Sequence, residues 1–156
     1  EFFHQAVQLL EKNKEYTGFD AQNKLLSLYF TLFEIFKANR SYILLVLNQI
    51  PSSLESKNEL KSFKKLFKNY VEALNIESID LKQVLLDEIK KKGILDVSWK
   101  QFIFILEFWI KDNSLGFEKT DILIEKSIKT GFDLLDITPV KSILDLSKFL
   151  IKEHLK

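Results

Sequence analysis

The stretch that most constrains the fold is Trp99–Ile110, which reads WKQFIFILEFWI. Nine of its twelve residues are apolar and five are aromatic. Wound as an α-helix, it would be apolar on nearly every side, so it has to be buried on more than one side. Because it is far shorter than the ~20 residues of a membrane-spanning helix, we expect its own domain to cover one side and a second subunit or a ligand to cover another.

Local signals predict where this helix and the one before it begin and end. Ser98, with Gln101 three residues later, forms a capping-box pattern that predicts a start, and Asp112-Asn113-Ser114 before Gly116 predicts a stop. A preceding helix is expected to open at Asp80 and to end at Gly93, which follows a run of three lysines. The sequence therefore predicts two separate helices between residues 80 and 111.

The whole chain is expected to be all-helical. It contains only four glycines and two prolines, and no alternating strand pattern. We predict about eight helices in a single domain covering residues 1–156. Their approximate ranges are 1–13, 20–38, 42–50, 55–74, 80–93, 98–111, 117–135 and 138–156.

Composition excludes several classes of function. A net charge of +1 argues against binding of polyanions through bulk charge. The absence of cysteine removes disulfides, thiolate metal sites and a cysteine nucleophile, and it is compatible with a reducing cytoplasm. His4 and His154 lie near opposite ends, and no metalloprotease, di-iron, phosphate-loop or nucleophile-elbow motif occurs. We expect a cytoplasmic protein that is not an enzyme and has no metal or cofactor.

The start of the chain resembles the middle of a longer protein. No methionine is present, and Glu1 is followed at once by apolar residues at helical spacing. We therefore expect the chain to be a fragment that lacks an N-terminal part. Arg40 is the only arginine among 23 basic residues, which we attribute to genomic bias rather than to function.

Two surface patterns allow two interpretations each. Four lysines line one face of the helix over 60–74, at Lys61, Lys64, Lys65 and Lys68. A solvated face is favoured over phosphate binding, because no aromatic residue interleaves with them. The last helix, after Thr138-Pro139, carries a narrow basic stripe. Docking onto the domain is favoured over a membrane surface, which needs a broad basic face.

Three stretches together resemble the C-terminal, ligand-binding and dimerisation domain of TetR-family transcriptional regulators. They read FFHQAVQLLEKN, FDAQNKLLSLYFTLFEIFKANRSYILLVL and WKQFIFILEFWIKDNSLGFEKTDILIEKSIKTGFDLLD. The resemblance covers essentially all 156 residues and rests on helix order. It implies a helical bundle whose last long helices pair with those of a second copy, as a four-helix bundle. The helix from Thr138 onward departs from a plain family end.

The resemblance also implies a mechanism. A small apolar effector would enter the bundle and change the DNA affinity of an N-terminal helix-turn-helix, which is missing from this chain. DNA would be contacted only through that missing domain. Two alternatives stay open: a lipid- or small-molecule-binding helical module with no DNA role, and a helical protein-interaction domain with no cavity.

The excess of aromatic residues predicts an apolar cavity. The 14 phenylalanines supply more ring surface than one packed face requires, and ligand sites are mostly apolar with a few polar anchors. The residues expected to line this cavity are Tyr29, Phe33, Phe36, Tyr42, Phe63, Phe67, Tyr70, Phe102, Leu106 and Trp109.

A two-fold homodimer is predicted through residues 99–111 and 117–135. The first helix has too little polar surface for one-sided burial, and the second has a face of small residues beside its apolar stripe. A short turn joins them as an antiparallel hairpin, and two hairpins can form a four-helix bundle. The residues expected at the seam are Phe104, Phe108, Leu123, Ser127, Thr130, Gly131 and Leu134.

Overall fold

The computed structural model describes residues 1–48, 59–76, 84–136, 146 and 152. Its elements are α1 (Phe2–Glu11), the short 3₁₀ turn η1 (Tyr16–Gly18), α2 (Ala21–Ala38), α3 (Arg40–Asn48), α4 (Glu59–Ala73), α5 (Val84–Lys111), the 3₁₀ turn η3 (Leu115–Phe117) and α6 (Glu118–Asp136). The described residues contain no strand. The all-α prediction is therefore confirmed.

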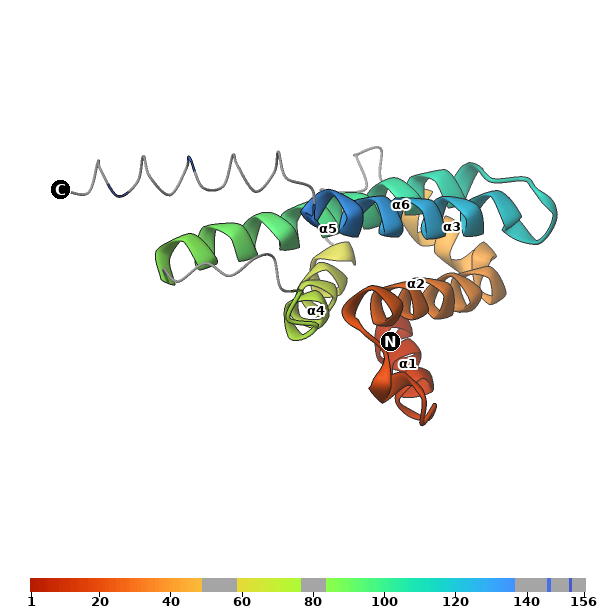
Figure 1. The fold of residues 1–156 in the computed structure, drawn as a ribbon. Coiled ribbons are helices and arrows are strands. Elements are labelled where there is room, and N and C mark those ends of the chain that lie inside the picture. The colour runs from red at the N-terminus through yellow and green to blue at the C-terminus, as the bar shows by residue number, and fades with distance from the viewer. Residues whose placement is uncertain (49–58, 77–83, 137–145, 147–151, 153–156) are drawn as a thin grey trace.

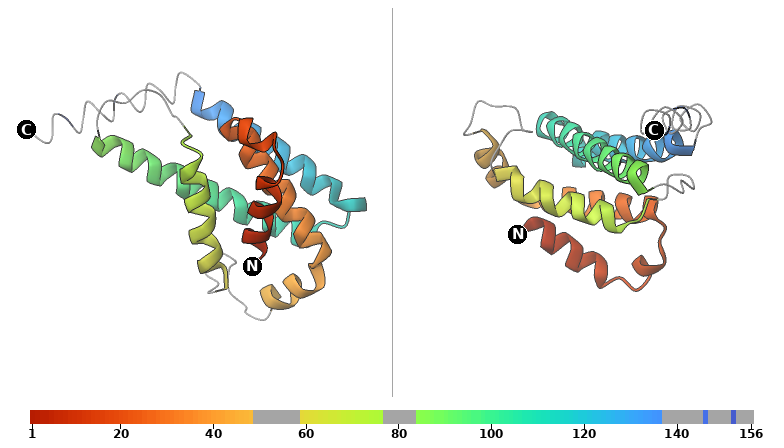
Figure 2. Two further views of the ribbon diagram at one scale, coloured as in Figure 1. Left: turned by 90° about the horizontal axis from the view of Figure 1, so that it is seen from below. Right: turned by 90° about the vertical axis from the view of Figure 1, so that its left-hand side faces the viewer.

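The helices stack in three layers (Figure 1). The long helices α5 and α6 run side by side in one layer, α2 and α4 lie beneath them, and α1 packs under α2. The side view in Figure 2 shows the same order, with α1 farthest from the α5–α6 layer. The core lies between the layers, and its largest fully buried side chains are Trp99, Trp109, Tyr29, Phe67 and Phe102.

The central helix α2 shows how the sequence specifies the layers. Its apolar side chains recur at helical spacing from Leu25 to Phe36, and this face is buried. The backbone N–H of Asn23 donates to the side chain of Asp20 at 2.7 Å, which is the cap expected for a helix beginning after Asp20. The predicted range of 20–38 for this helix is confirmed.

The prediction of two helices between residues 80 and 111 is wrong. Helix α5 is continuous from Val84 to Lys111, so neither Gly93 nor Ser98 marks a helix end. A glycine inside a helix costs about 1 kcal/mol relative to alanine. Burying Trp99 and partly burying Ile94 and Leu95 against the core outweighs that cost. Packing of the whole helix therefore overrides the local stop and start signals.

This continuous helix changes the helix count. The described residues form six α-helices rather than about eight. One expected helix is lost by the fusion within α5. The expected last helix, 138–156, lies almost wholly outside the described residues, as do the predicted stop at Pro51 and the predicted caps at Ser52 and Asp80.

The predicted end of α5 at Lys111 is confirmed. Asp112 follows the helix and is buried, and its carboxylate accepts hydrogen bonds from the backbone and side chain of both Ser114 and Thr120. The turn then places two residues in the left-handed region, Gly116 at φ 62° and Phe117 at φ 65°. This turn reverses the chain, so α5 and α6 form a hairpin, as predicted.

Candidate functional site

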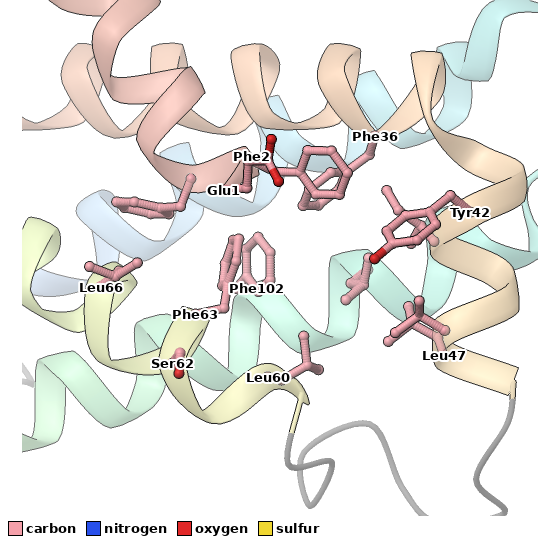
Figure 3. A pocket seen from close by; sticks show the side chains of 14 residues that line it. Glu1, Phe2, Phe36, Tyr42, Leu47, Leu60, Ser62, Phe63, Leu66 and Phe102 are labelled. Carbon is pink, nitrogen blue, oxygen red and sulfur yellow. The ribbon is translucent and has the colours of Figure 1, made fainter.

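A cavity of about 340 Å³ lies at the end of the molecule where α1, α3 and α4 meet α5. Figure 3 shows its lining, with Phe63 and Phe102 on one wall and Tyr42 of α3 across from them. The rings of Phe63 and Phe102 are stacked, with centroids 5.0 Å apart and planes 26° apart. The rest of the lining is mostly apolar, with Glu1 and Ser62 as polar residues. The full lining comprises Glu1, Phe2, Phe3, Phe36, Tyr42, Ile43, Val46, Leu47, Leu60, Ser62, Phe63, Leu66, Phe102 and Leu106.

Half of the residues that the sequence suggested for a ligand site come together here. They are Phe36, Tyr42, Phe63, Phe102 and Leu106. They come from four different helices, so only the tertiary fold brings them to one place. That they bind a ligand stays a prediction.

The other five suggested residues lie outside this lining. Tyr29, Phe33, Phe67 and Trp109 are buried in the core, where their rings contact one another and Phe102. Edge-to-face and stacked rings at 5–7 Å fill space efficiently. These rings therefore supply the packed floor behind the cavity rather than its surface. Within the described part of the chain, the hydroxyl of Tyr29 has no hydrogen-bond partner, and burial raises the pKa of Tyr29.

Tyr70, the fifth of these residues, has a polar contact instead. Its hydroxyl is hydrogen-bonded to the hydroxyl of Tyr16 in η1, and it reaches the carbonyl oxygen of Lys24 in α2 at 3.1 Å. Burial is the main cause that raises the pKa of Tyr70, and the hydrogen bond to Tyr16 raises it further. The pair ties η1 and the end of α4 to the start of α2.

The sequence reasoning missed the contribution of α1 to the cavity. Phe2 and Phe3 line it, and they also contact rings of other helices: Phe2 meets Tyr42 at 6.2 Å and Phe3 meets Phe63 at 5.4 Å between centroids. The apolar spacing at the start of the chain had indicated a buried helix face. Which partner that face meets depends on how α1 crosses α2, and no local pattern contains that information.

A second apolar hollow, an open groove of about 770 Å³, lies between α5 and α6. Its α5 side includes Gly93, Val97 and Gln101. Its α6 side includes five of the seven residues that the sequence suggested for a dimer seam: Leu123, Ser127, Thr130, Gly131 and Leu134. The other two, Phe104 and Phe108, lie farther along α5 and are 55% and 37% exposed. Their place at a dimer seam stays a prediction.

The groove exposes apolar surface and helical glycines together. Val97 is 67% exposed and Leu134 is 50% exposed. A Cβ added to Gly131 would meet only Gln101 Nε2 at 3.9 Å, and one added to Gly93 would meet nothing within 4 Å. Packing among the described residues therefore does not require glycine at either position, although each glycine weakens its helix.

Arg40, the first residue of α3, binds the end of α5 and so links the α5–α6 hairpin to the junction of α2 and α3. Its guanidinium donates to the carbonyl oxygens of Trp109 and Ile110 at 3.0 and 2.9 Å, in the last turn of α5. The same group lies over the rings of Trp109 and Phe117, at 4.6 and 4.8 Å from their centroids. A cation is favoured at a helix C-terminus and over aromatic faces. The only arginine in the chain thus has a structural role that composition did not reveal.

The described residues also bear on a metal site and on a membrane-spanning helix. Among the residues that the structure describes, no group of three or more His, Asp or Glu side chains is placed to hold a metal ion. In the same part of the chain, no helix combines the length and apolar character needed to cross a membrane.

Comparison with known proteins identifies a family for this chain. Searches of the curated proteins and of the solved structures found nothing significant. A family model described as "Tetracyclin repressor-like, C-terminal domain" matches residues 24–150, from α2 to beyond the end of α6. Domains of this kind are regulatory, and they typically dimerise and bind small-molecule effectors. The chain therefore belongs to the family of tetracyclin repressor-like C-terminal domains.

Proposed function

We propose that residues 1–156 form one effector-binding and dimerisation domain of a transcriptional regulator, without enzymatic activity. A small apolar effector occupies the cavity between α1, α3, α4 and α5. Its binding changes the DNA affinity of a helix-turn-helix elsewhere in the complete regulator. The observation that carries this proposal is the family match over residues 24–150, in a fold that has an apolar cavity.

The cavity supports the effector role by its size and lining. Small-molecule sites are concave and mostly apolar, with a few polar groups that orient the ligand. Here the polar groups are the hydroxyls of Tyr42 and Ser62 and the carboxylate of Glu1. An effector shifts the regulator only if it binds its DNA-competent and DNA-incompetent states with different affinity.

The groove and the exposed phenylalanines support the dimer. Phe104 and Phe108 are one helical turn apart on α5 and share an exposed face. A second copy of the α5–α6 hairpin, related by a two-fold axis, would cover them with the same residues from the partner. An obligate interface of this type buries more than ~2,000 Å² in total.

Two experiments test the proposal. The first is sedimentation equilibrium of the chain at micromolar concentration, where we expect a dimer; a monomer would reject the dimer. The second fills the cavity of the complete regulator by Leu66→Trp, with Leu9→Trp on the exposed side of α1 as the control.

In that second experiment, operator affinity is measured with and without an effector found by thermal-shift screening. We expect Leu66→Trp to abolish the effector's influence while leaving DNA binding intact, and Leu9→Trp to behave as wild type. An effector that binds the cavity but never alters operator affinity would favour a binding module with no DNA role.

A further inference from the structure

The charge and the ring content of the cavity indicate which effectors it can accept. Fourteen residues line it, and none of these described residues is Lys, Arg or His. The one ionisable acid among them is Glu1, at the N-terminal end of α1. Among the described lining residues, an anionic ligand would therefore find no cationic side chain and would meet the carboxylate of Glu1.

The carboxylate of Glu1 has no partner among the described residues. Among the described residues, neither an ion pair nor a side-chain hydrogen bond involves this group, and Glu1 makes no side-chain cap to α1. Figure 3 places Glu1 at the same end of the cavity as Phe2 and Phe36. A positively charged group entering there would gain an opposite charge that currently faces solvent.

The rings favour the same kind of ligand. Phe2, Phe36, Phe63, Phe102 and Tyr42 all line the cavity, and aromatic faces attract cations that lie within about 6 Å of them. Lys64, next to Phe63 in the sequence, lies over the ring of Trp99 instead, 5.6 Å from its centroid. Phe102 is fully buried and stacks on Phe63 and Trp99, so the rings that keep accessible surface for a ligand are those of Phe2, Phe63 and Tyr42.

The volume limits the size of the ligand. An engineered apolar cavity of about 150 Å³ holds one benzene molecule. The present cavity, about 340 Å³, is roughly twice that size and has room for two fused rings.

We propose that the effector is a flat organic cation of about two fused rings, whose charge is delocalised over an aromatic system. It lies among the phenylalanine rings with its positive end toward Glu1. This inference rests on the proposed effector role of the cavity, and it replaces a wholly apolar effector with a mostly apolar one that carries a single positive charge.

Three probes of nearly identical shape test the sign of the charge: 1-methylquinolinium, 1-methylnaphthalene and 1-naphthoate, which carry one positive, no and one negative charge. Binding is measured by calorimetry on the 156-residue chain, with the α-amino group of Glu1 acetylated so that it adds no cation beside the carboxylate. We expect the cation to bind about tenfold more tightly than the neutral probe, and the anion to bind most weakly.

Two variants separate the contributions. Glu1→Gln should weaken the cation about fivefold and leave 1-methylnaphthalene unchanged, whereas Glu11→Gln, at the other end of the same helix, should change neither. Phe63→Leu should weaken the cation more than the neutral probe, because it removes one aromatic face.

The outcomes distinguish this inference from the proposed function. If 1-methylnaphthalene binds as tightly as the cation, or if Glu1→Gln has no effect, the charge preference is rejected while the cavity remains an effector site. If none of the three probes binds, both the charge preference and the effector role are rejected.

Discussion

The cavity and the groove are both apolar, yet they are built from different residues. Six of the fourteen residues that line the cavity are aromatic, and they come from α1, α2, α3, α4 and α5. The groove has one aromatic residue, Phe132, beside aliphatic and small residues that include two glycines and come mostly from α5 and α6. Rings form stiff walls around a small molecule. Glycines have no side chain to contact a small ligand, but they allow the backbone of another helix to approach closely. The difference teaches that apolar character alone does not identify the occupant; the size and rigidity of the side chains do.

The largest expected effect separates the cavity from the predicted dimer seam along a single helix. Phe102 is fully buried beside the cavity, whereas Phe104, two residues later, is 55% exposed. Phe102→Ala should lower the free energy of unfolding by about 4 kcal/mol, because it leaves a hole among five neighbouring rings. Phe104→Ala should reduce stability only at concentrations where the dimer forms.

Urea unfolding at two protein concentrations measures both effects. The distinction between the cavity and the predicted dimer seam fails if the two alanine variants lose equal stability at every concentration.

The second prediction concerns the groove alone. Gly131→Arg introduces a bulky cation where a partner helix is expected, so the dimer dissociation constant should rise at least a hundredfold, or about 3 kcal/mol. Gly18→Arg is the matched control, because Gly18 is also uncrowded but lies in η1, away from the groove. Sedimentation gives the constants, and circular dichroism checks that α-helical content is retained. A Gly131→Arg protein that remains dimeric would place the seam elsewhere.

The third prediction concerns the turn that holds the two sides of the groove together. Burial alone would raise the pKa of Asp112, but hydrogen bonds from Thr120 and Ser114 lower it to about 2. Because the folded-state pKa lies below the ordinary value of 3.8, this carboxylate stabilises the fold above about pH 4. That stabilisation should be lost as the pH falls from about 4 to 2.

Asp112→Asn should therefore cost about 2 kcal/mol at pH 7 and should flatten the loss of stability below pH 4. Exposed Asp133, on α6, provides the control variant Asp133→Asn. Free energies of unfolding at pH 7, 4, 3 and 2 give the comparison. An unchanged acid profile in Asp112→Asn would show that other carboxylates control acid unfolding.

The smallest expected effect has opposite signs in monomer and dimer. Gly93→Ala meets no atom within 4 Å and removes a helical glycine, so each subunit should gain about 1 kcal/mol. If a partner helix lies against Gly93, the same methyl group should weaken the dimer about fivefold. Thermal unfolding below the dimer dissociation constant, together with sedimentation above it, measures the two effects. A gain in both would mean that no partner approaches this position.

Sequence patterns predicted the elements that depend on local interactions. The range of α2 follows from its Asp20 cap and apolar spacing, and the stop of α5 follows from the Asp112 turn. The same patterns failed within α5, where a glycine and a capping-box pattern occur inside a helix that tertiary packing keeps continuous. Local signals record what an isolated segment prefers, and burial of Trp99 outweighs that preference.

The sequence predicted a group of aromatic rings for the cavity, but not which of those rings would line it. Helical spacing identified apolar faces, but it could not decide which rings would fill the core, as Tyr29 and Phe67 do, and which would surround empty space, as Phe36 and Phe63 do. The contacts of Arg40 were beyond local reasoning too, because its partners Trp109 and Ile110 lie 69 and 70 residues away. Such contacts depend on how helices cross.

The unbroken course of α5 has a consequence for how this chain can change over evolutionary time. Gln101 faces the groove and Phe102 faces the cavity, so the same helix fixes how the two surfaces are oriented relative to each other. Each residue turns a helix by about 100°. One residue inserted between Ser98 and Gln101 would therefore rotate the cavity-facing Phe102 and Leu106 relative to the groove-facing Gly93 and Val97. Substitutions can alter either surface separately, whereas insertions or deletions within α5 disturb both at once. Length variation among relatives should accordingly fall outside this helix.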